Sequence, residues 1–211
     1  MGPIKAIVFD AYGTLLRIED KRRPYARLLE AIGETGRAIT EDDKKRVMTS
    51  NVGLVGVTDL FQTHIPSALL SALEQDLLAE LMSVTLYPDV ELTLNTLRNR
   101  GYKIAVCSNL AAPYALPVKA LLPFELDAYV WSFDAGAIKP EAAIYGKTCT
   151  SLACQPDEII MVGDTLLADY QGPREFGMQS VHLARNGKSP VTDALVSLGE
   201  LLPMLLRYQT S

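Results

Sequence analysis

The chain has 211 residues, of which 48% are hydrophobic and 21% charged, and its formal net charge is −5. These proportions are those of an ordinary globular protein with one substantial core, and the acidic balance excludes the basic surface that nucleic-acid binding requires. No apolar stretch approaches the roughly 18 residues of a membrane span. The three cysteines have neither disulfide nor zinc-site spacing. We therefore expect a cytoplasmic protein with reduced thiols and no nucleic-acid or membrane partner.

The first predicted element is an apolar strand over residues 4–9, which ends at Asp10 and is followed by the turn sequence Ala11-Tyr12-Gly13-Thr14. An acid at this place is held by the sheet behind it and points into the crevice outside the strand ends, where ligands bind in open α/β sheets. A carboxylate there can act as a nucleophile and form an intermediate that water opens. Asp10 is therefore the first candidate catalytic residue.

Residues 19–86 contain no convincing strand and read as three or four helices. Proline suits an early helical position, and threonine followed by acids suits a helix start. Gly53 and Gly56 predict a loop between the second and third helices. The clearest helix starts are at Pro24, Thr40 and Ser67.

From residue 87 onward, strands and helices alternate, which implies a parallel sheet with right-handed crossovers. The helical block before it is then an insertion over the carboxyl edge of that sheet. We expect an α/β protein in which residues 1–16 and 87–211 form a Rossmann-like core and residues 17–86 a helical cap. The predicted strands are 103–107, 129–131, 159–162 and 179–183, and the predicted helices 89–100, 112–121, 141–152, 166–176 and 192–207.

Polar residues collect where the predicted strands end. Asp10, Ser108 and Asp164 each follow an apolar strand directly, so all three should emerge at one edge of the sheet. Lys139 precedes the next predicted helix, and Asp169 lies in the first turn after Asp164. Such convergence is typical of an active site.

The charges of this group need compensation. Two carboxylates about 4 Å apart repel by about 4 kcal/mol at an effective dielectric of about 20, so three acids require cations. Lys139 supplies one positive charge, and Mg²⁺ held by carboxylates, water and a substrate phosphate would supply the rest. The hydroxyls of Thr14 and Ser108, with the backbone N–H groups of the turn, are donors that a phosphate needs.

This layout resembles the haloacid dehalogenase-like (HAD) hydrolase superfamily, in the group whose helical cap is inserted between the first and second motifs. The resemblance spans nearly the whole chain. The stretches similar to its four motifs are Asp10-Ala11-Tyr12-Gly13-Thr14, Ser108-Asn109, Lys139-Pro140, and Gly163-Asp164 with Asp169.

The resemblance implies roles for these residues. Asp10 would be the nucleophile and Lys139 would neutralise it and the phosphate. Ser108 would bind the transferred group with Thr14 nearby, and Asn109 joins these catalytic candidates through the second motif. A further set would hold Mg²⁺ or support its ligands, namely Asp10, the carbonyl of Tyr12, Asp164 and, as a ligand or one layer behind, Asp169.

One position departs from the phosphatase pattern. Phosphatases of this family usually carry Asp two residues after the nucleophile to protonate the leaving oxygen, and here that residue is Tyr12. The sequence around Asp10 looks like that of 2-haloacid dehalogenases, whose leaving halide needs no proton, and Tyr145 agrees with that branch. The Asp164 and Asp169 motif instead resembles the Mg²⁺-dependent phosphatases. The sequence around Asp10 therefore indicates a dehalogenase, whereas the motif with Asp164 and Asp169 indicates a phosphatase.

Two extra carboxylates beside a nucleophilic one make little electrostatic sense without a metal, which favours a Mg²⁺-dependent phosphatase acting on a small phosphorylated metabolite. A metal-independent 2-haloacid dehalogenase is the alternative, and a weakly active binding protein of the same fold is a third reading. Tyr12, Arg23 and Tyr145 are candidate substrate contacts. His182 is expected to face a helix or solvent. The oligomeric state, monomer or homodimer, is left open.

Overall fold

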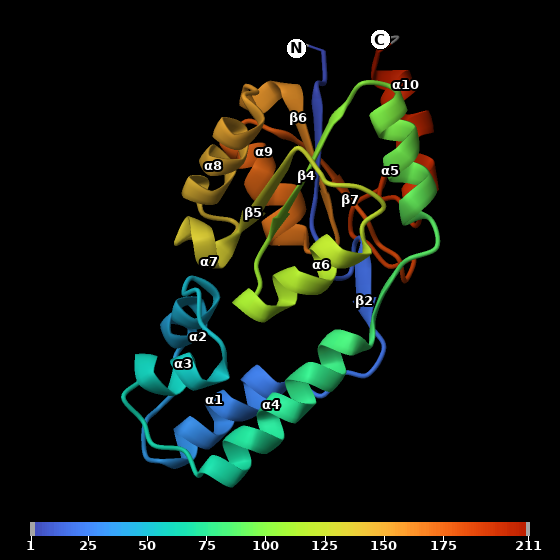
Figure 1. The fold of residues 1–211 in the computed structure, drawn as a ribbon. Coiled ribbons are helices and arrows are strands. Elements are labelled where there is room, and N and C mark those ends of the chain that lie inside the picture. Colours follow the sequence, from blue (N-terminus) through green and yellow to red (C-terminus); the bar gives the residue numbers. More distant parts are fainter. Residues whose placement is uncertain (1–2, 210–211) are drawn as a thin grey trace.

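The computed structural model describes residues 3–209 and contains a parallel sheet of five strands in the order β5-β4-β1-β6-β7 (Figure 1). Nearly all strand residues are buried, as expected for strands covered on both faces. The predicted α/β fold with a parallel sheet is confirmed. The strands are β1 (Ala6–Phe9), β4 (Lys103–Ser108), β5 (Ala128–Trp131), β6 (Ile159–Gly163) and β7 (Gln179–His182).

Helices cover both faces of this sheet. Ile7 and Phe9 of β1 face an apolar layer formed by α5 (Val90–Asn99), α6 (Ala115–Leu121) and α10 (Leu201–Gln209). Ala6 and Val8 alternate with them and face the opposite layer. That layer is formed by α8 (Ala142–Leu152) and α9 (Gly172–Phe176), and the short helix α7 (Ser132–Ala135) follows β5.

A second group of helices lies beyond one end of the sheet (Figure 1). It has an apolar cluster of its own, centred on Leu28, Ile32, Val57 and Leu73, and we call it the helical unit. Two short antiparallel strands, β2 (Leu16–Ile18) and β3 (Val84–Leu86), join it to the core. Its helices are α1 (Pro24–Glu34), α2 (Glu41–Met48), α3 (Leu54–Leu60) and α4 (Ser67–Met82).

Local chemistry explains where two of these helices begin. Pro24 occupies the first position of α1, where its missing N–H costs nothing. Thr40 accepts a hydrogen bond from the backbone of Asp43, and the Asp43 side chain accepts one from the backbone of Thr40. This reciprocal cap satisfies donors that a helix start otherwise leaves unpaired.

Several predicted elements differ from the structure. The loop expected around Gly53 and Gly56 is confirmed at Gly53 and wrong at Gly56, because α3 begins directly after Gly53 and includes Gly56. Strands β2 and β3 were not predicted, since three residues are too few to show an alternating pattern. The terminal helix starts only at Leu201, because Leu195 instead pairs with Leu183 beside the sheet. Within residues 3–209, every helix is too short or too polar to cross a bilayer.

Arg185 ties together three segments around the sheet edge. Its guanidinium lies 3.8 Å above the ring of Tyr87 and donates to the carbonyl of Thr14, with a 3.0 Å bond from Nε. It also donates to both carboxylate oxygens of Asp89, at 3.0 and 3.1 Å. Asp89 in turn accepts from the hydroxyl of Ser197 at 2.7 Å. The turn after Asp10 is therefore fixed to the start of α5 and to the C-terminal segment.

Arg185→Lys tests this arrangement. Lysine keeps the charge but cannot serve the Thr14 carbonyl and both oxygens of Asp89 at once. We expect the melting temperature at pH 7 to fall by about 3–6 °C, the equivalent of one or two lost charge-assisted hydrogen bonds. Arg100→Lys, at an exposed arginine, is the matched control and should leave it unchanged.

The deficit should also depend on pH. Burial raises the pKa of Asp89, but the bonds from Arg185 and Ser197 outweigh burial and hold that pKa below its usual value. The pairing therefore stabilises the fold above about pH 4 and loses its effect as the pH falls through the folded-state pKa. Thermal denaturation across this range measures it. An undiminished deficit at the lowest pH would contradict the assignment.

Candidate active site

Asp10 stands at the end of β1, where its backbone N–H donates to the carbonyl of Val162 at 2.9 Å. Its side chain is nearly buried, and Oδ1 accepts hydrogen bonds from Ser108 Oγ at 3.0 Å and Lys139 Nζ at 2.8 Å. Within residues 3–209, no hydrogen bond reaches Oδ2 of Asp10. One oxygen is therefore held while the other is available for attack.

Lys139 lies at the centre of the site with a side chain only 2% exposed. Its ammonium group donates to Asp10 Oδ1, to Asp169 Oδ1 at 2.5 Å and to the carbonyl of Cys107 at 2.7 Å. Burial lowers the pKa of Lys139, but Asp10 and Asp169 raise it by more. The ammonium stays charged, so Lys139 acts as a fixed cation and not as a base.

Asn109 holds the backbone of Lys139 from two sides. Its amide nitrogen donates to the Lys139 carbonyl at 2.9 Å, and its amide oxygen accepts from the Lys139 N–H at 2.7 Å. Both polar ends of the side chain are therefore occupied by the backbone of one residue. The sequence placed Asn109 among catalytic candidates, and the structure gives it the geometry of a residue that positions Lys139.

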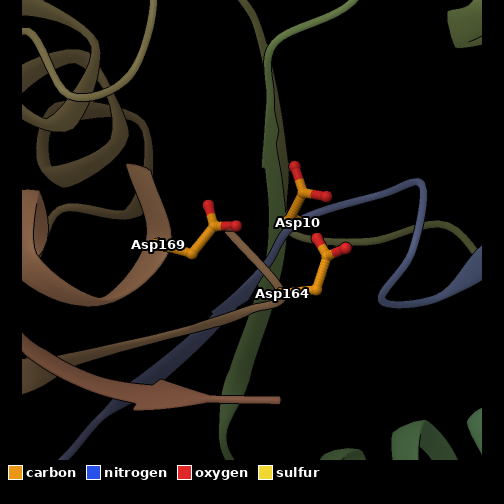
Figure 2. A group of neighbouring side chains, drawn as sticks. All are labelled: Asp10, Asp164 and Asp169. Atoms are coloured by element: carbon orange, nitrogen blue, oxygen red, sulfur yellow. The ribbon is translucent and has the colours of Figure 1, made fainter. Parts of the chain in front are cut away.

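Three carboxylates gather at the strand ends (Figure 2). One oxygen from each of Asp10, Asp164 and Asp169 lies within 4.8 Å of the other two. Asp169 is buried between Lys139 and the N–H of Thr165, which donates to its Oδ2 at 2.9 Å. Asp164 is more exposed, and among residues 3–209 only its own backbone N–H donates to its carboxylate. Partial burial and the charge of Asp10 raise the pKa of Asp164.

Two glycines allow the acids to come this close. Gly13 has φ +92°, and a Cβ there would collide with the carboxylate of Asp164. A Cβ at Gly163 would collide with the carboxylate of Asp169. Any other residue at either position would push an acid out of the group.

One ammonium thus faces three carboxylates, which leaves an excess of negative charge beside an open oxygen of Asp10. Carboxylate oxygens are the ligands that a hard divalent cation prefers. The donor set fits Mg²⁺, because no other side chain among residues 3–209 donates to the carboxylate of Asp164, and one of its oxygens lies within 4.8 Å of one from Asp10. Asp10 and Asp164 are the residues that could hold such an ion.

The succession of motifs at the strand ends corresponds to a known family, since the family model described as haloacid dehalogenase-like hydrolase matches residues 4–177. The chain belongs to this family. It is 27% identical to (S)-2-haloacid dehalogenase 4A of Burkholderia cepacia over 98% of this chain and 97% of that protein. It is also 29% identical to a glyceraldehyde 3-phosphate phosphatase of Methanopyrus kandleri, over 86% of this chain and 84% of that one.

A solved structure agrees with the sequence relatives. The crystal structure of a HAD phosphatase from Thermococcus onnurineus superposes with a TM-score of 0.66 at 26% identity, covering 96% of this chain and 98% of that chain. The family establishes that this protein is a hydrolase. Its relatives include both dehalogenases and phosphatases, so the choice between these reactions rests on the residues of this site.

The hydroxyl of Tyr12 is already engaged in this HAD-family site. It donates to the carbonyl of Tyr114 at 2.8 Å, and the two rings meet edge to face with centroids 5.8 Å apart. Burial, with a smaller effect of Glu80, raises the pKa of Tyr12. The phenol is therefore neither free nor acidic enough to protonate a leaving group well.

The remaining predicted site residues are less directly placed. Thr14 is fully buried, and its hydroxyl has no hydrogen-bond partner within residues 3–209. Arg23 lines the large cavity described below. Tyr145 is buried in the core and donates to the carbonyl of Ala168 at 2.6 Å, so its position does not support the predicted substrate contact. It packs beneath the segment that carries Asp169.

Two residues near the site were not among the site residues predicted from the sequence. Glu80 is buried, and one of its oxygens accepts the N–H groups of Arg22 and Arg23, both at 2.7 Å. The other accepts the hydroxyl of Tyr114 at 3.0 Å. A signal did exist, because Glu80 lies seven residues after Leu73 and hence on the buried face of α4.

His182 is the second. As expected, its ring faces a helical segment, with its centroid 6.3 Å from that of Tyr170, but it is also buried and its Nε2 lies 3.0 Å from the carbonyl oxygen of Asp164. Its Nδ1 contacts the hydroxyl of Ser189 at 2.7 Å. His182 lies close to Asp164 because the strand register pairs it with Gly163. Sequence spacing does not reveal which strands are neighbours.

Asn109→Ala should show what the hold on Lys139 contributes. Loss of both hydrogen bonds lets the ammonium shift, and a displacement of about 1 Å is enough to lower hydrolase kcat by roughly 10- to 100-fold. KM should change less, because Asn109 does not reach the open side of Asp10. Steady-state kinetics measure this, with the exposed Asn99→Ala of α5 as control. A kcat equal to that of the unaltered enzyme would contradict the positioning role.

Tyr12→Phe separates packing from acid catalysis. Because the hydroxyl already serves the Tyr114 carbonyl, kcat should stay within about twofold of the parent value, while one lost hydrogen bond lowers the melting temperature by about 2–4 °C. A general acid contributes about 10²–10⁴ in rate, so a drop of that size would show that Tyr12 donates a proton after all.

Proposed function

We propose that this hydrolase is a Mg²⁺-assisted phosphatase that acts on a small phosphate monoester through an aspartyl-phosphate intermediate. The observation that carries the proposal is the excess of acid at the sheet edge, where Lys139 compensates only part of the charge of Asp10, Asp164 and Asp169. A site that merely attacked carbon would gain nothing from Asp164, whose carboxylate repels the nucleophile.

The metal would be held by Asp10, by Asp164 and by the backbone carbonyl of Tyr12. When bound, Mg²⁺ supplies positive charge to the phosphate oxygens and offsets the repulsion between the carboxylates. Asp169 supports this arrangement by holding Lys139, since both of its oxygens are already used.

The chain's own residues account for the bond changes. Oδ2 of Asp10 attacks phosphorus while the ester P–O bond breaks. The electron pair of the broken bond leaves with the alkoxide, which takes a proton from water. Lys139 and Ser108 keep Oδ1 oriented and would offer N–H and O–H groups to the charge that develops. Water then attacks the same phosphorus, the bond to Asp10 breaks, and inorganic phosphate leaves with the carboxylate restored.

We further propose that residues 17–86 act as a cap and that residues 1–16 and 87–211 form the catalytic core. Three polar contacts join α2 and α4 to the core. Closure of such a unit would exclude water from the aspartyl intermediate. The three cysteines are free thiols, which supports a cytoplasmic location. The contacts are Glu80 with Tyr114, Met48 with Ser132, and Lys45 with Glu141.

A 2-haloacid dehalogenase is the second candidate, favoured by the engaged hydroxyl of Tyr12 and by the full-length similarity to the Burkholderia dehalogenase. Here Asp10 would attack the carbon that bears the halogen, and the halide would leave with the bonding electrons and without a proton. Water would then open the ester at its carbonyl carbon. No group would be needed where phosphatases place their acid.

The leading proposal predicts Mg²⁺-dependent phosphate release from a panel that includes acetyl phosphate, whose leaving group needs little protonation. Asp10→Asn should abolish turnover. Asp164→Asn should raise the half-saturating Mg²⁺ concentration by at least about tenfold, because it removes one anionic ligand. Asp157→Asn, at an exposed acid of the 3₁₀ turn before β6, is the control and should change neither quantity.

The contrary outcomes are distinct. Chloride release from 2-chloropropionate that survives EDTA, without phosphate release, would replace the phosphatase by the dehalogenase. No turnover of either substrate class would indicate a weakly active protein that uses this fold for binding.

A further inference from the structure

A cavity of about 820 Å³ lies between the helical unit and the core. Its walls come from α1, α2 and α4 on one side and from Tyr12 and residues 110–114 on the other. Tyr12 and Leu110 each lie two residues after a strand-end residue of the site, Asp10 and Ser108. The cavity therefore begins at the turns that carry the nucleophile, and its volume falls in the range of small-molecule pockets.

Three tyrosines form an aromatic wall in this cavity. Tyr12 donates to the carbonyl of Tyr114, Tyr25 to the carbonyl of Val52 at 3.3 Å, and Tyr114 to the carboxylate of Glu80. The rings of Tyr25 and Tyr114 lie 6.0 Å apart. Because each hydroxyl already has an acceptor in the protein, the wall offers a ligand ring carbon and few free polar groups.

The charged groups of the lining are largely neutralised. Glu80 is saturated by two N–H groups and one hydroxyl, Arg37 pairs with Asp43 although its Nε has no partner among residues 3–209, and Lys44 pairs with Glu41 at 2.6 Å. The exposed Arg23 and Glu30 add one charge of each sign. Aliphatic side chains make up most of the remainder, namely Leu29, Ile39, Val47, Met48 and Leu110.

We propose that the cavity holds an apolar, ring-sized body of the substrate, so that the protein acts on phosphate monoesters of aromatic or branched aliphatic alcohols. This rests on the proposed phosphatase function and names its substrate class. A short sugar phosphate would place hydroxyls against ring carbon, where they lose hydrogen bonds to water without replacement. A three-carbon acid would fill only a small part of the space.

The test compares 2-phenylethyl phosphate with ethyl phosphate. Because both leaving groups are primary alcohols, the ratio of the two kcat/KM values measures only the contribution of the apolar part of the substrate. Burial of one methylene is worth about 0.8 kcal/mol, or roughly fourfold. We therefore expect kcat/KM to be at least about tenfold higher for the phenyl compound. A ratio near one, with both esters hydrolysed, would overturn the inference and leave the phosphatase function standing.

A filled cavity should remove the preference. In Ala26→Trp an indole occupies the space beside α1, and the ratio should fall toward one, with circular dichroism verifying the fold. Glu34→Trp places the same ring on an exposed position of the same helix and should keep the parent ratio. A parent-like ratio in a folded Ala26→Trp would contradict occupancy of the cavity.

Measured affinities distinguish a failure of this inference from a failure of the phosphatase proposal. With Asp10→Asn and Mg²⁺ in the calorimeter, 2-phenylethyl phosphate should bind at least about tenfold more tightly than ethyl phosphate even if no ester is turned over by the parent enzyme. Absence of turnover with this preference would refute only the reaction. Equal affinities, or no binding of either ester, would refute the apolar substrate class.

Discussion

The buried ammonium of Lys139 is the interaction on which the site depends. A charge with a side chain 2% exposed is costly unless every hydrogen has an acceptor, and here Asp10, Asp169 and the Cys107 carbonyl take all three. The same bonds fix Oδ1 of Asp10 and leave its other oxygen without a hydrogen bond among residues 3–209. Asn109 then holds the Lys139 peptide, so the cation is constrained at both its head and its backbone.

The sheet order makes this convergence possible. With β1 between β4 and β6, the three strands deliver Asp10, Ser108 and Asp164 side by side, and Gly13 and Gly163 leave room for the acids. Arg185 fixes the turn after Asp10 from outside. All of these features act at the carboxyl ends of the three strands, and together they bring residues far apart in the sequence into one charged group.

Much of this could be predicted from the sequence. Apolar runs that end in Asp10, Ser108 and Asp164 gave both the parallel sheet and the members of the polar group, because strand ends share an edge. The roles of Asn109 and His182 could not be predicted, since they depend on strand neighbours and on loop conformation. Gly56 misled because a single glycine is tolerated inside a helix, and a family resemblance does not say which way the ring of Tyr145 points.

Glu80 has a consequence for how the two parts of the molecule separate. Two of its three donors, the N–H groups of residues 22 and 23, belong to the same side as Glu80 itself, and only the Tyr114 hydroxyl comes from the core. If the parts move apart, the carboxylate exchanges one partner for water and keeps two, which costs about 0.5–3 kcal/mol. Such opening would therefore not strip this buried anion of all its partners.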